Sequence, residues 1–177
     1  MMKLDYVSSQ KRGETDRLLA ELATELRADG LALRGLVKEL SYTAAYQNGC
    51  DMSVCVLPEG PAIKITQNLG VGSDACRLDP AALAEAVAQV ERCGLEGADL
   101  FILNKFGPEE AAGRGFCAAI GRALEHDIPV LVGVGAANKD AFQAFAEGLA
   151  EELPDDSGAL RNWYIAVRGV TWFEATP

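Results

Sequence analysis

Histidine is nearly absent from this sequence, and so are the pairings that depend on it. His126 is the only histidine among 177 residues. That leaves no histidine-based zinc site, and no Ser-His or Cys-His nucleophile pair unless another base serves. The place of His126 near the predicted end of a helix favours a surface role at the helix dipole. Five cysteines are present, but none form a CxxC pair, so we interpret them as reduced thiols that mainly pack in the core.

Basic residues are also in deficit. The chain carries 16 lysines and arginines against 26 aspartates and glutamates, which gives a net charge of −10 and a pI near 4.6. This charge argues against a nucleic-acid backbone or an anionic membrane as the main partner. No apolar run approaches the length of a membrane span, and no signal-peptide pattern is found. We therefore expect a soluble, cytoplasmic protein.

The chain does, by contrast, contain enough hydrophobic residues to form the core of one well-buried domain. Hydrophobic residues make up 49% of the chain and no linker or repeat divides it, which predicts a single domain over 1–177. Its anchor is the stretch from Ala98 to Gly107, whose middle is apolar without alternation. Such a short run predicts a central strand of a parallel sheet over 98–106, with neighbours on both sides. Ligands bind beyond the carboxyl ends of such strands, where Asn104 and Lys105 stand here.

A loop near the start of the chain occupies the position of a phosphate-binding loop. It joins a predicted strand at Leu4–Val7 to a helix marked by a stripe of leucines. Set against the pattern G-x-x-x-x-G-K-[ST], the loop matches at Gly13 and Thr15. Ser8 replaces the first glycine, and Glu14 stands in place of the lysine. In a working P-loop that lysine reaches the β- and γ-phosphates, whereas a glutamate repels them.

Periodicity and chain-breaking residues predict the other elements. Strands are predicted within 31–40, at 52–56 and 63–65 as a hairpin, and at 129–134, with helices beginning at Asp79-Pro80, Gly107-Pro108 and Asn138 and a last helix over 160–167. Phe142, Phe145 and Leu149 mark the buried side of the helix after Asn138. The order of elements predicts an α/β fold, a mainly parallel sheet with helices on both faces and a β-hairpin insertion. The apolar tail at 170–173 is expected to dock on the body or on another subunit, so a homo-oligomer stays open.

The connector at 68–79 is the least ordinary loop. Two glycines free its backbone to present N–H groups, Ser73 adds a hydroxyl and Arg77 adds a positively charged guanidinium group. That combination can cradle an oxyanion. The alternative is a plain turn with Arg77 paired to one of many carboxylates, and the low specificity of the motif favours it. Cys50 beside Asp51 is a further candidate, a thiol at a loop-to-strand junction.

Four motifs carry a family resemblance. They are Cys50-Asp51-Met52, Ile65-Thr66-Gln67-Asn68-Leu69-Gly70, Cys76-Arg77-Leu78-Asp79-Pro80 and Asn104-Lys105-Phe106-Gly107. With the order of elements, they make the chain resemble the P-loop nucleoside triphosphatases. More specifically, it resembles an uncharacterised bacterial family of degenerate P-loop nucleoside-triphosphatase-like proteins encoded near molybdate-uptake genes. The resemblance covers nearly the whole chain and implies the fold, but no mechanism.

The departures from the parent superfamily concern its charged groups. There the strand at the anchor position carries the Walker-B acids, typically Asp-Glu-x-Gly followed by a further Glu. Here Asn104 and Lys105 stand at the two acid positions, while Gly107 and a trailing glutamate survive. The lysine and the carboxylate-held magnesium ion on which phosphoryl transfer depends are thus missing. Either Lys105 swings toward a phosphate in place of the lost lysine, or it pairs with Glu14 across the strand ends.

These departures predict a non-hydrolysing binding or regulatory protein rather than an enzyme. Its partner is expected to be an oxyanion, a phosphorylated ligand or a protein, in molybdenum-related physiology. The alternative is an unorthodox nucleotide-dependent enzyme, NTPase or kinase-like, in which Lys105 and Arg77 replace the missing groups. The sequence identifies no catalytic residue, no metal ligand and no cofactor. The predicted ligand-binding residues are Ser8, Ser9, Gly13, Thr15, Arg77, Asn104 and Lys105.

Overall fold

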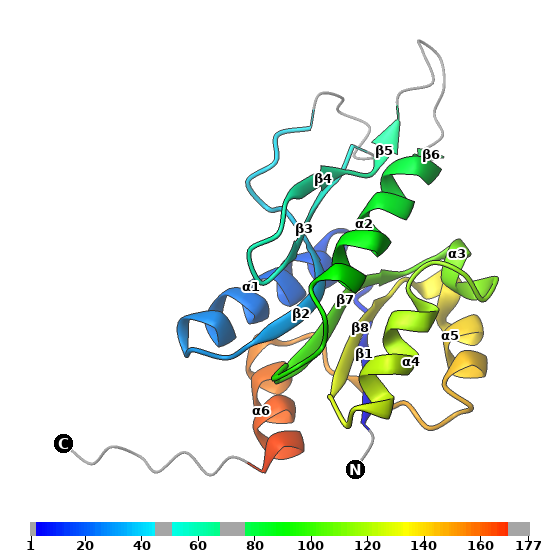
Figure 1. Cartoon of the computed structure of the whole chain (residues 1–177). Coiled ribbons are helices and arrows are strands. Elements are labelled where there is room, and N and C mark those ends of the chain that lie inside the picture. The colour runs from blue at the N-terminus through cyan, green and yellow to red at the C-terminus, as the bar shows by residue number, and fades with distance from the viewer. Residues whose placement is uncertain (1–2, 45–50, 68–76, 170–177) are drawn as a thin grey trace.

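The computed structural model describes residues 3–44, 51–67 and 77–169 (Figure 1). The strands are β1 Leu4–Val7, β2 Leu33–Lys38, β3 Ser53–Leu57, β4 Ala62–Lys64, β5 Thr66–Gln67, β6 Arg77–Leu78, β7 Leu100–Phe106, β8 Val130–Val134 and β9 Glu152–Leu153. The helices are α1 Glu14–Ala28, α2 Pro80–Arg92, α3 Pro108–Ala111, α4 Cys117–Glu125, the 3-10 turn η1 Ala136–Asn138, α5 Lys139–Phe145 and α6 Ser157–Arg168. No helix in these ranges has the length and apolar character needed to cross a membrane.

Seven strands form one sheet in the order β4-β3-β2-β7-β8-β1-β9. From β2 to β9 every neighbouring pair is parallel, whereas β3 is antiparallel to both β2 and β4. The short strands β5 and β6 form a separate antiparallel pair. β7 lies between β2 and β8, both parallel to it, which confirms the prediction made from its unalternating run. The predicted α/β fold with a β-hairpin insertion is confirmed.

Helices cover both faces of the sheet (Figure 1). α1 and α6 pack on one face, and α2, α4 and α5 pack on the other. In β7, Leu100 and Ile102 pack in the core beneath α1 and α6, and Phe101 and Leu103 pack in the core on the opposite face. Each of the four is 1% exposed or less. Burial contributes about 1.5–3 kcal/mol for each such side chain. Because water reaches neither face, the strand needs no alternation of polar and apolar residues.

Two glycines let the central strands approach closely enough to assemble the strand ends. Gly35 in β2 has a φ of +102°, and a Cβ there would lie 2.0 Å from the carbonyl oxygen of Ile102. A Cβ on Gly133 in β8 would lie 2.2 Å from the carbonyl oxygen of Asn104 and 3.0 Å from Cγ2 of Thr15. Gly133 therefore brings the end of β7 and the start of α1 together over β8.

The extent predicted for the helix after Asn138 is wrong. α5 ends at Phe145, and Leu149 lies outside it, 75% exposed. The reason is backbone geometry: Glu147 and Gly148 have φ values of 52° and 72°, which turn the chain out of the helix. Asn138 precedes α5 as predicted, but its side chain forms no capping hydrogen bond.

Candidate functional site

The carboxyl ends of β2 and β7 and the loop after β1 enclose a cavity of about 420 Å³. Its charged and amide lining comes from Arg12, Asp16, Lys38, Asn104, Lys105 and Glu110. This edge of a parallel sheet is where ligands bind in open α/β folds. The cavity, bounded by the first loop, the strand ends and the helix that follows β7, is therefore the candidate site.

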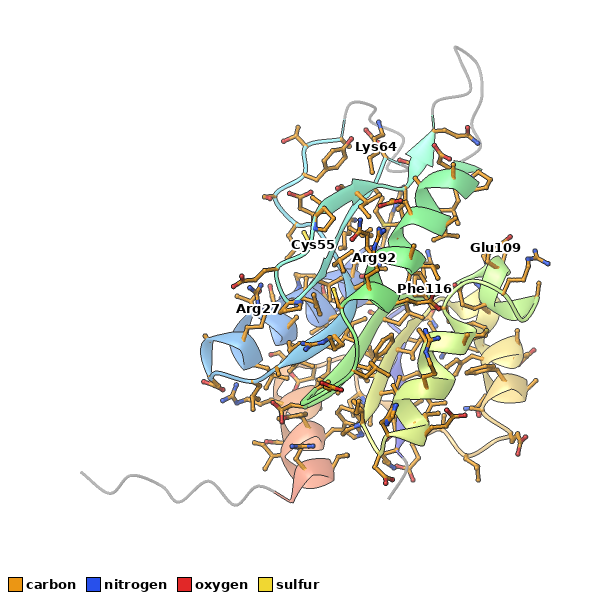
Figure 2. All side chains as sticks on the ribbon, viewed as in Figure 1. Arg27, Cys55, Lys64, Arg92, Glu109 and Phe116 are labelled. Carbon is orange, nitrogen blue, oxygen red and sulfur yellow. The ribbon has the colours of Figure 1, made fainter. Side chains whose placement is uncertain are left out.

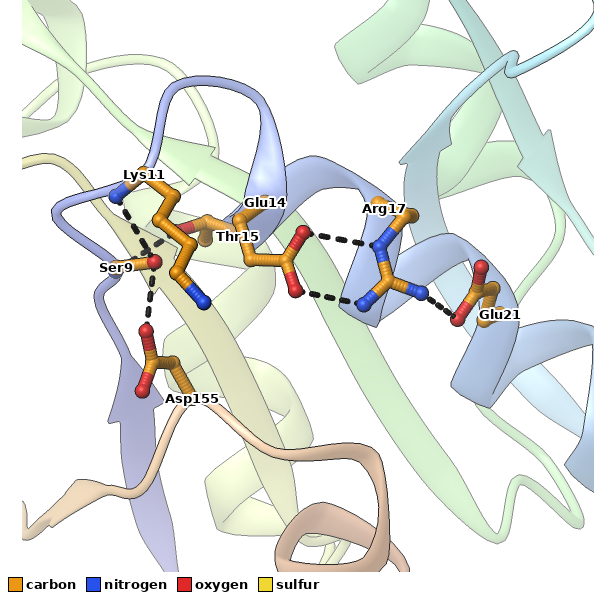
Figure 3. Close-up of polar contacts among 7 residues, drawn as sticks. All are labelled: Ser9, Lys11, Glu14, Thr15, Arg17, Glu21 and Asp155. Atoms are coloured by element: carbon orange, nitrogen blue, oxygen red, sulfur yellow. Dashed lines mark hydrogen bonds and ion pairs between the residues drawn. The ribbon is translucent and has the colours of Figure 1, made fainter.

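The first loop is held by its own hydrogen bonds (Figure 3). Gly13, with a φ of 76°, turns the chain into α1. The backbone N–H of Ser9 donates to the hydroxyl of Thr15 at 3.0 Å, and the N–H of Lys11 donates to the hydroxyl of Ser9 at 3.1 Å. The Thr15 hydroxyl, which would ligate magnesium in a working P-loop, thus closes the loop on itself.

The outer side of the loop is joined to the connection between β9 and α6. The Ser9 hydroxyl donates to Asp155 at 2.7 Å, a contact between residues 146 apart in sequence (Figure 3). This hydrogen bond lowers the pKa of the Asp155 carboxyl, and the charge of Lys11 lowers it further. Asp155 therefore holds the loop from outside the cavity.

Replacing Ser9 with alanine should raise the pKa of Asp155 toward its ordinary value, because the charged carboxylate loses its main donor. A lowered pKa stabilises the fold above the ordinary pKa, and that contribution disappears as the pH falls through the lowered value. The unfolding free energies of the wild type and Ser9→Ala should thus converge in acid. NMR titration of the carboxyl measures the shift, with Ser41→Ala, whose hydroxyl contacts Glu39, as the control. An unchanged pKa in Ser9→Ala would contradict the assignment.

Glu14, at the position of the missing lysine, is turned along the outside of α1. Its carboxylate accepts from Nε and Nη2 of Arg17 at 2.9 and 2.6 Å, and Arg17 also bonds Glu21 (Figure 3). The hydrogen bond from Arg17 lowers the pKa of Glu14, with smaller contributions from nearby positive charge. The pairing of Glu14 with Lys105 considered from the sequence is not formed. Nor does the Glu14 carboxylate occupy the cavity.

Asn104, at the position of the first Walker-B acid, joins three elements. It is 1% exposed, and its amide nitrogen donates to Asp16 in α1 at 3.3 Å. Its amide oxygen accepts from the backbone N–H of Lys38 in β2 at 3.2 Å. The ammonium of Lys38 completes the ring, 3.4 Å from the other oxygen of Asp16. The amide therefore works as a structural connector, since its oxygen and its nitrogen each already have a partner.

Lys105 points the other way and is exposed in the cavity. A Cβ added at Gly135, just past β8, would lie 3.8 Å from Cε of Lys105, which places the side chain over the neighbouring strand end. Within residues 3–44, 51–67 and 77–169, no hydrogen bond or ion pair engages its ammonium. The lysine thus brings an uncompensated positive charge to the site.

Glu110 closes the far side of the cavity and breaks the helix predicted to begin at Gly107. Its carboxylate, in a residue only 5% exposed, accepts from the backbone N–H groups of Gly107 and Phe116, each at 3.0 Å. A Cβ on Gly115 would fall 2.0 Å from this carboxylate. The chain therefore bends through glycines here, and two short helices, α3 and α4, replace the single predicted one.

The structure brings together only part of the predicted site. Gly13, Asn104 and Lys105 line the cavity. Ser9 and Thr15 bond each other at the loop, and Ser8 is 9% exposed with a hydroxyl that has no hydrogen-bond partner. Arg77 begins β6, but its side chain, like Cys50, Ser73 and the tail at 170–173, lies outside the described part of the structure.

Asp16 and Lys38 belong to the site but are not among the residues predicted from the sequence. Lys38 is a polar residue at the end of an apolar strand, the same signal that identified Asn104 and Lys105. Asp16 directly follows Thr15 in the first turn of α1, where an acidic residue is also expected for the helix dipole. Among the described residues, no group of three or more His, Cys, Asp or Glu side chains could hold a metal ion.

Comparison with known proteins gives three findings. Residues 4–163 match the model of a family described as "Protein of unknown function (DUF2478)". The chain is 33% identical over 153 residues to a molybdenum import ATP-binding protein, ModC 2, of Bradyrhizobium diazoefficiens, an alignment that covers 85% of this chain and 17% of that protein. The solution structure of a human cancer-related nucleoside triphosphatase superposes with a TM-score of 0.60 at 12% identity, over 96% of this chain and all of that one. The last likeness shows the fold, an α/β fold similar to that of the nucleoside triphosphatase.

Proposed function

We propose that this chain, which belongs to the DUF2478 family of proteins of unknown function, is a non-hydrolysing anion-binding protein on a P-loop scaffold. The anion is an oxyanion or the phosphate of a small molecule, and it binds in the cavity at the carboxyl ends of β2 and β7.

The charge balance of the cavity carries the proposal. Lys38 is paired with Asp16, and the carboxylate of Glu110 is satisfied by two backbone N–H groups. Arg12 also has an interaction of its own. The ammonium of Lys105 has no partner among the described residues, so an anion that enters meets a positive charge that no side chain there neutralises.

Two substitutions in the phosphate-handling positions support binding without hydrolysis. Glu14 replaces the lysine that would neutralise the phosphates, and its carboxylate is committed to Arg17. Asn104 replaces the acid that would hold magnesium, and its amide is committed to Asp16 and Lys38. Neither position supplies the charge that phosphoryl transfer requires.

The name of the Bradyrhizobium relative supports including molybdate among the candidate oxyanions. That relative is a molybdenum import ATP-binding protein, and this chain spans about a sixth of its length. A role in molybdenum physiology is therefore part of the proposal. Regulation would follow if anion binding changes the contact of this domain with a protein partner.

The test compares two variants that remove the same charge. Lys105→Ala should weaken binding of inorganic phosphate, molybdate and ATP by about ten-fold or more, because a charge-assisted hydrogen bond is lost. Arg92→Ala removes an exposed cation at the far end of α2 (Figure 2) and should leave affinity unchanged. Glu14→Lys should strengthen binding, since it adds positive charge next to Gly13 in the cavity lining. Isothermal titration measures all three; equal affinities in Lys105→Ala and Arg92→Ala would reject the proposal.

A further inference from the structure

Part of the cavity wall is apolar. It is formed by Leu36, Met52, Val54, Ile65, Leu83 and Phe116, the last of which is labelled in Figure 2. Leu36, Val54 and Leu83 belong to β2, β3 and α2, and the other three side chains come from just before β3, from between β4 and β5 and from the turn before α4. The wall is therefore built by several elements. A bare oxyanion such as phosphate or molybdate would use the lysine and leave this wall unused.

The apolar wall continues into a second cavity of about 630 Å³ between α2 and α3. The two cavities share Leu78, Leu83 and Pro108 in their linings. Beyond these residues the groove runs along Ala84 and Val87 of α2. The site is therefore polar at the strand ends and becomes an apolar groove farther along α2.

The charged residues differ between the Lys105 end of the cavity and the groove beside α2. The charged residues that line the groove in the described structure are Glu91 and Glu109, paired with Arg122 and Arg114. The pairing with Arg114 lowers the pKa of Glu109, which stays a carboxylate. An anionic group is thus favoured at the Lys105 end, whereas the groove offers it an apolar floor and charged residues that are already paired with each other.

We infer that the ligand is an organic anion with an extended apolar body, rather than a bare inorganic oxyanion. Its phosphate or similar anionic group lies at Lys105, and its body passes Leu83 into the groove beside α2. This inference rests on the proposed function, since it assigns the rest of the molecule whose anionic group the cavity binds. Ligand sites of this kind combine a mainly apolar lining with a few placed polar groups.

The experiment compares inorganic phosphate with naphthyl phosphate, which adds an apolar body to the same anionic group. Naphthyl phosphate should bind about ten- to a hundred-fold more tightly, because its rings leave water for the apolar wall. Leu83→Asn should remove about ten-fold of that gain, measured as the ratio of the two affinities. Leu149→Asn, at a leucine 75% exposed outside the site, should change neither affinity.

A second variant tests the groove without disturbing the packing of the hydrophobic core. Ala84 is exposed on α2, and Ala84→Trp fills the groove without removing any buried side chain. It should weaken naphthyl phosphate binding selectively, as Leu83→Asn does. Equal affinity for the two probes, or no selective loss in Ala84→Trp, would overturn this inference. The proposed function would still stand in that case if phosphate binding depends on Lys105. Binding of both probes that is insensitive to Lys105→Ala would overturn the proposed function itself.

Discussion

Purified protein is expected to release no phosphate from ATP or GTP with magnesium beyond the spontaneous rate. Removing a single charge-stabilising group from an enzyme site lowers kcat about 100- to 1,000-fold. Under the proposed function, Glu14 and Asn104 stand where two such groups would be needed, and the Thr15 hydroxyl accepts a hydrogen bond from the Ser9 N–H. A coupled phosphate-release assay measures the rate. Sustained release that disappears in Thr15→Ala would contradict the prediction and favour an unorthodox nucleotide-dependent enzyme.

Restoring the acid alone should not restore hydrolysis, and the structure explains why. Asn104→Asp would place a carboxylate where the amide nitrogen now lies 3.3 Å from Asp16. Two carboxylates at that distance repel, and the ring with Lys38 would lose a hydrogen bond. The double variant with Glu14→Lys should therefore also stay inactive. Asn104→Asp is expected to lower the free energy of unfolding, which a urea titration detects alongside the activity assay.

The sequence predicted the central strand because the cause of its pattern is local. Burial on both faces selects an apolar residue at each position from Leu100 to Leu103, and the polar Asn104 and Lys105 then follow near the end of β7. The fold class followed from the same reasoning. The helix after Asn138 was predicted too long because its stripe continues to Leu149, while the backbone at Glu147 and Gly148 leaves the helix.

The partners of the site residues could not be predicted in the same way. The ring of Asp16, Lys38 and Asn104 depends on the register of β2 against β7, in which Leu36 lies opposite Leu103. The Ser9–Asp155 contact joins residues 146 apart in sequence. The direction of Glu14, by contrast, follows from Arg17 three residues later, a helical spacing that favours an ion pair.

Asp5 should be the most costly single side chain to remove among the polar groups of the core. It is fully buried in β1, the strand that leads into the first loop. Its carboxylate accepts from the indole N–H of Trp163 in α6 at 2.6 Å and from the backbone N–H of Glu151, before β9, at 2.8 Å. The ammonium of Lys3 lies 3.1 Å away. One side chain thus ties β1 to both β9 and α6.

Asp5→Ala is therefore expected to lower the free energy of unfolding by about 3–5 kcal/mol, because buried donors and a lysine lose their partner. For a chain of this size that corresponds to a fall in Tm of about 10 °C. Trp163→Phe, which removes one donor, should cost less. The double variant should cost less than the sum of the two, since the two residues interact directly.

Urea unfolding of the wild type, both single variants and the double variant measures these differences. The matched control is Asp29→Ala, which removes the same side chain from a surface pair with Arg161 and should cost less than about 1 kcal/mol. Because Asp5 ties β1, which leads into the first loop, to β9 and α6, between which Asp155 lies, we expect it to set the distance that the Ser9–Asp155 bond spans. Asp5→Ala should therefore weaken that bond and raise the pKa of Asp155 even while the protein stays folded. A loss of stability with no change in that pKa would show that the loop is positioned without Asp5.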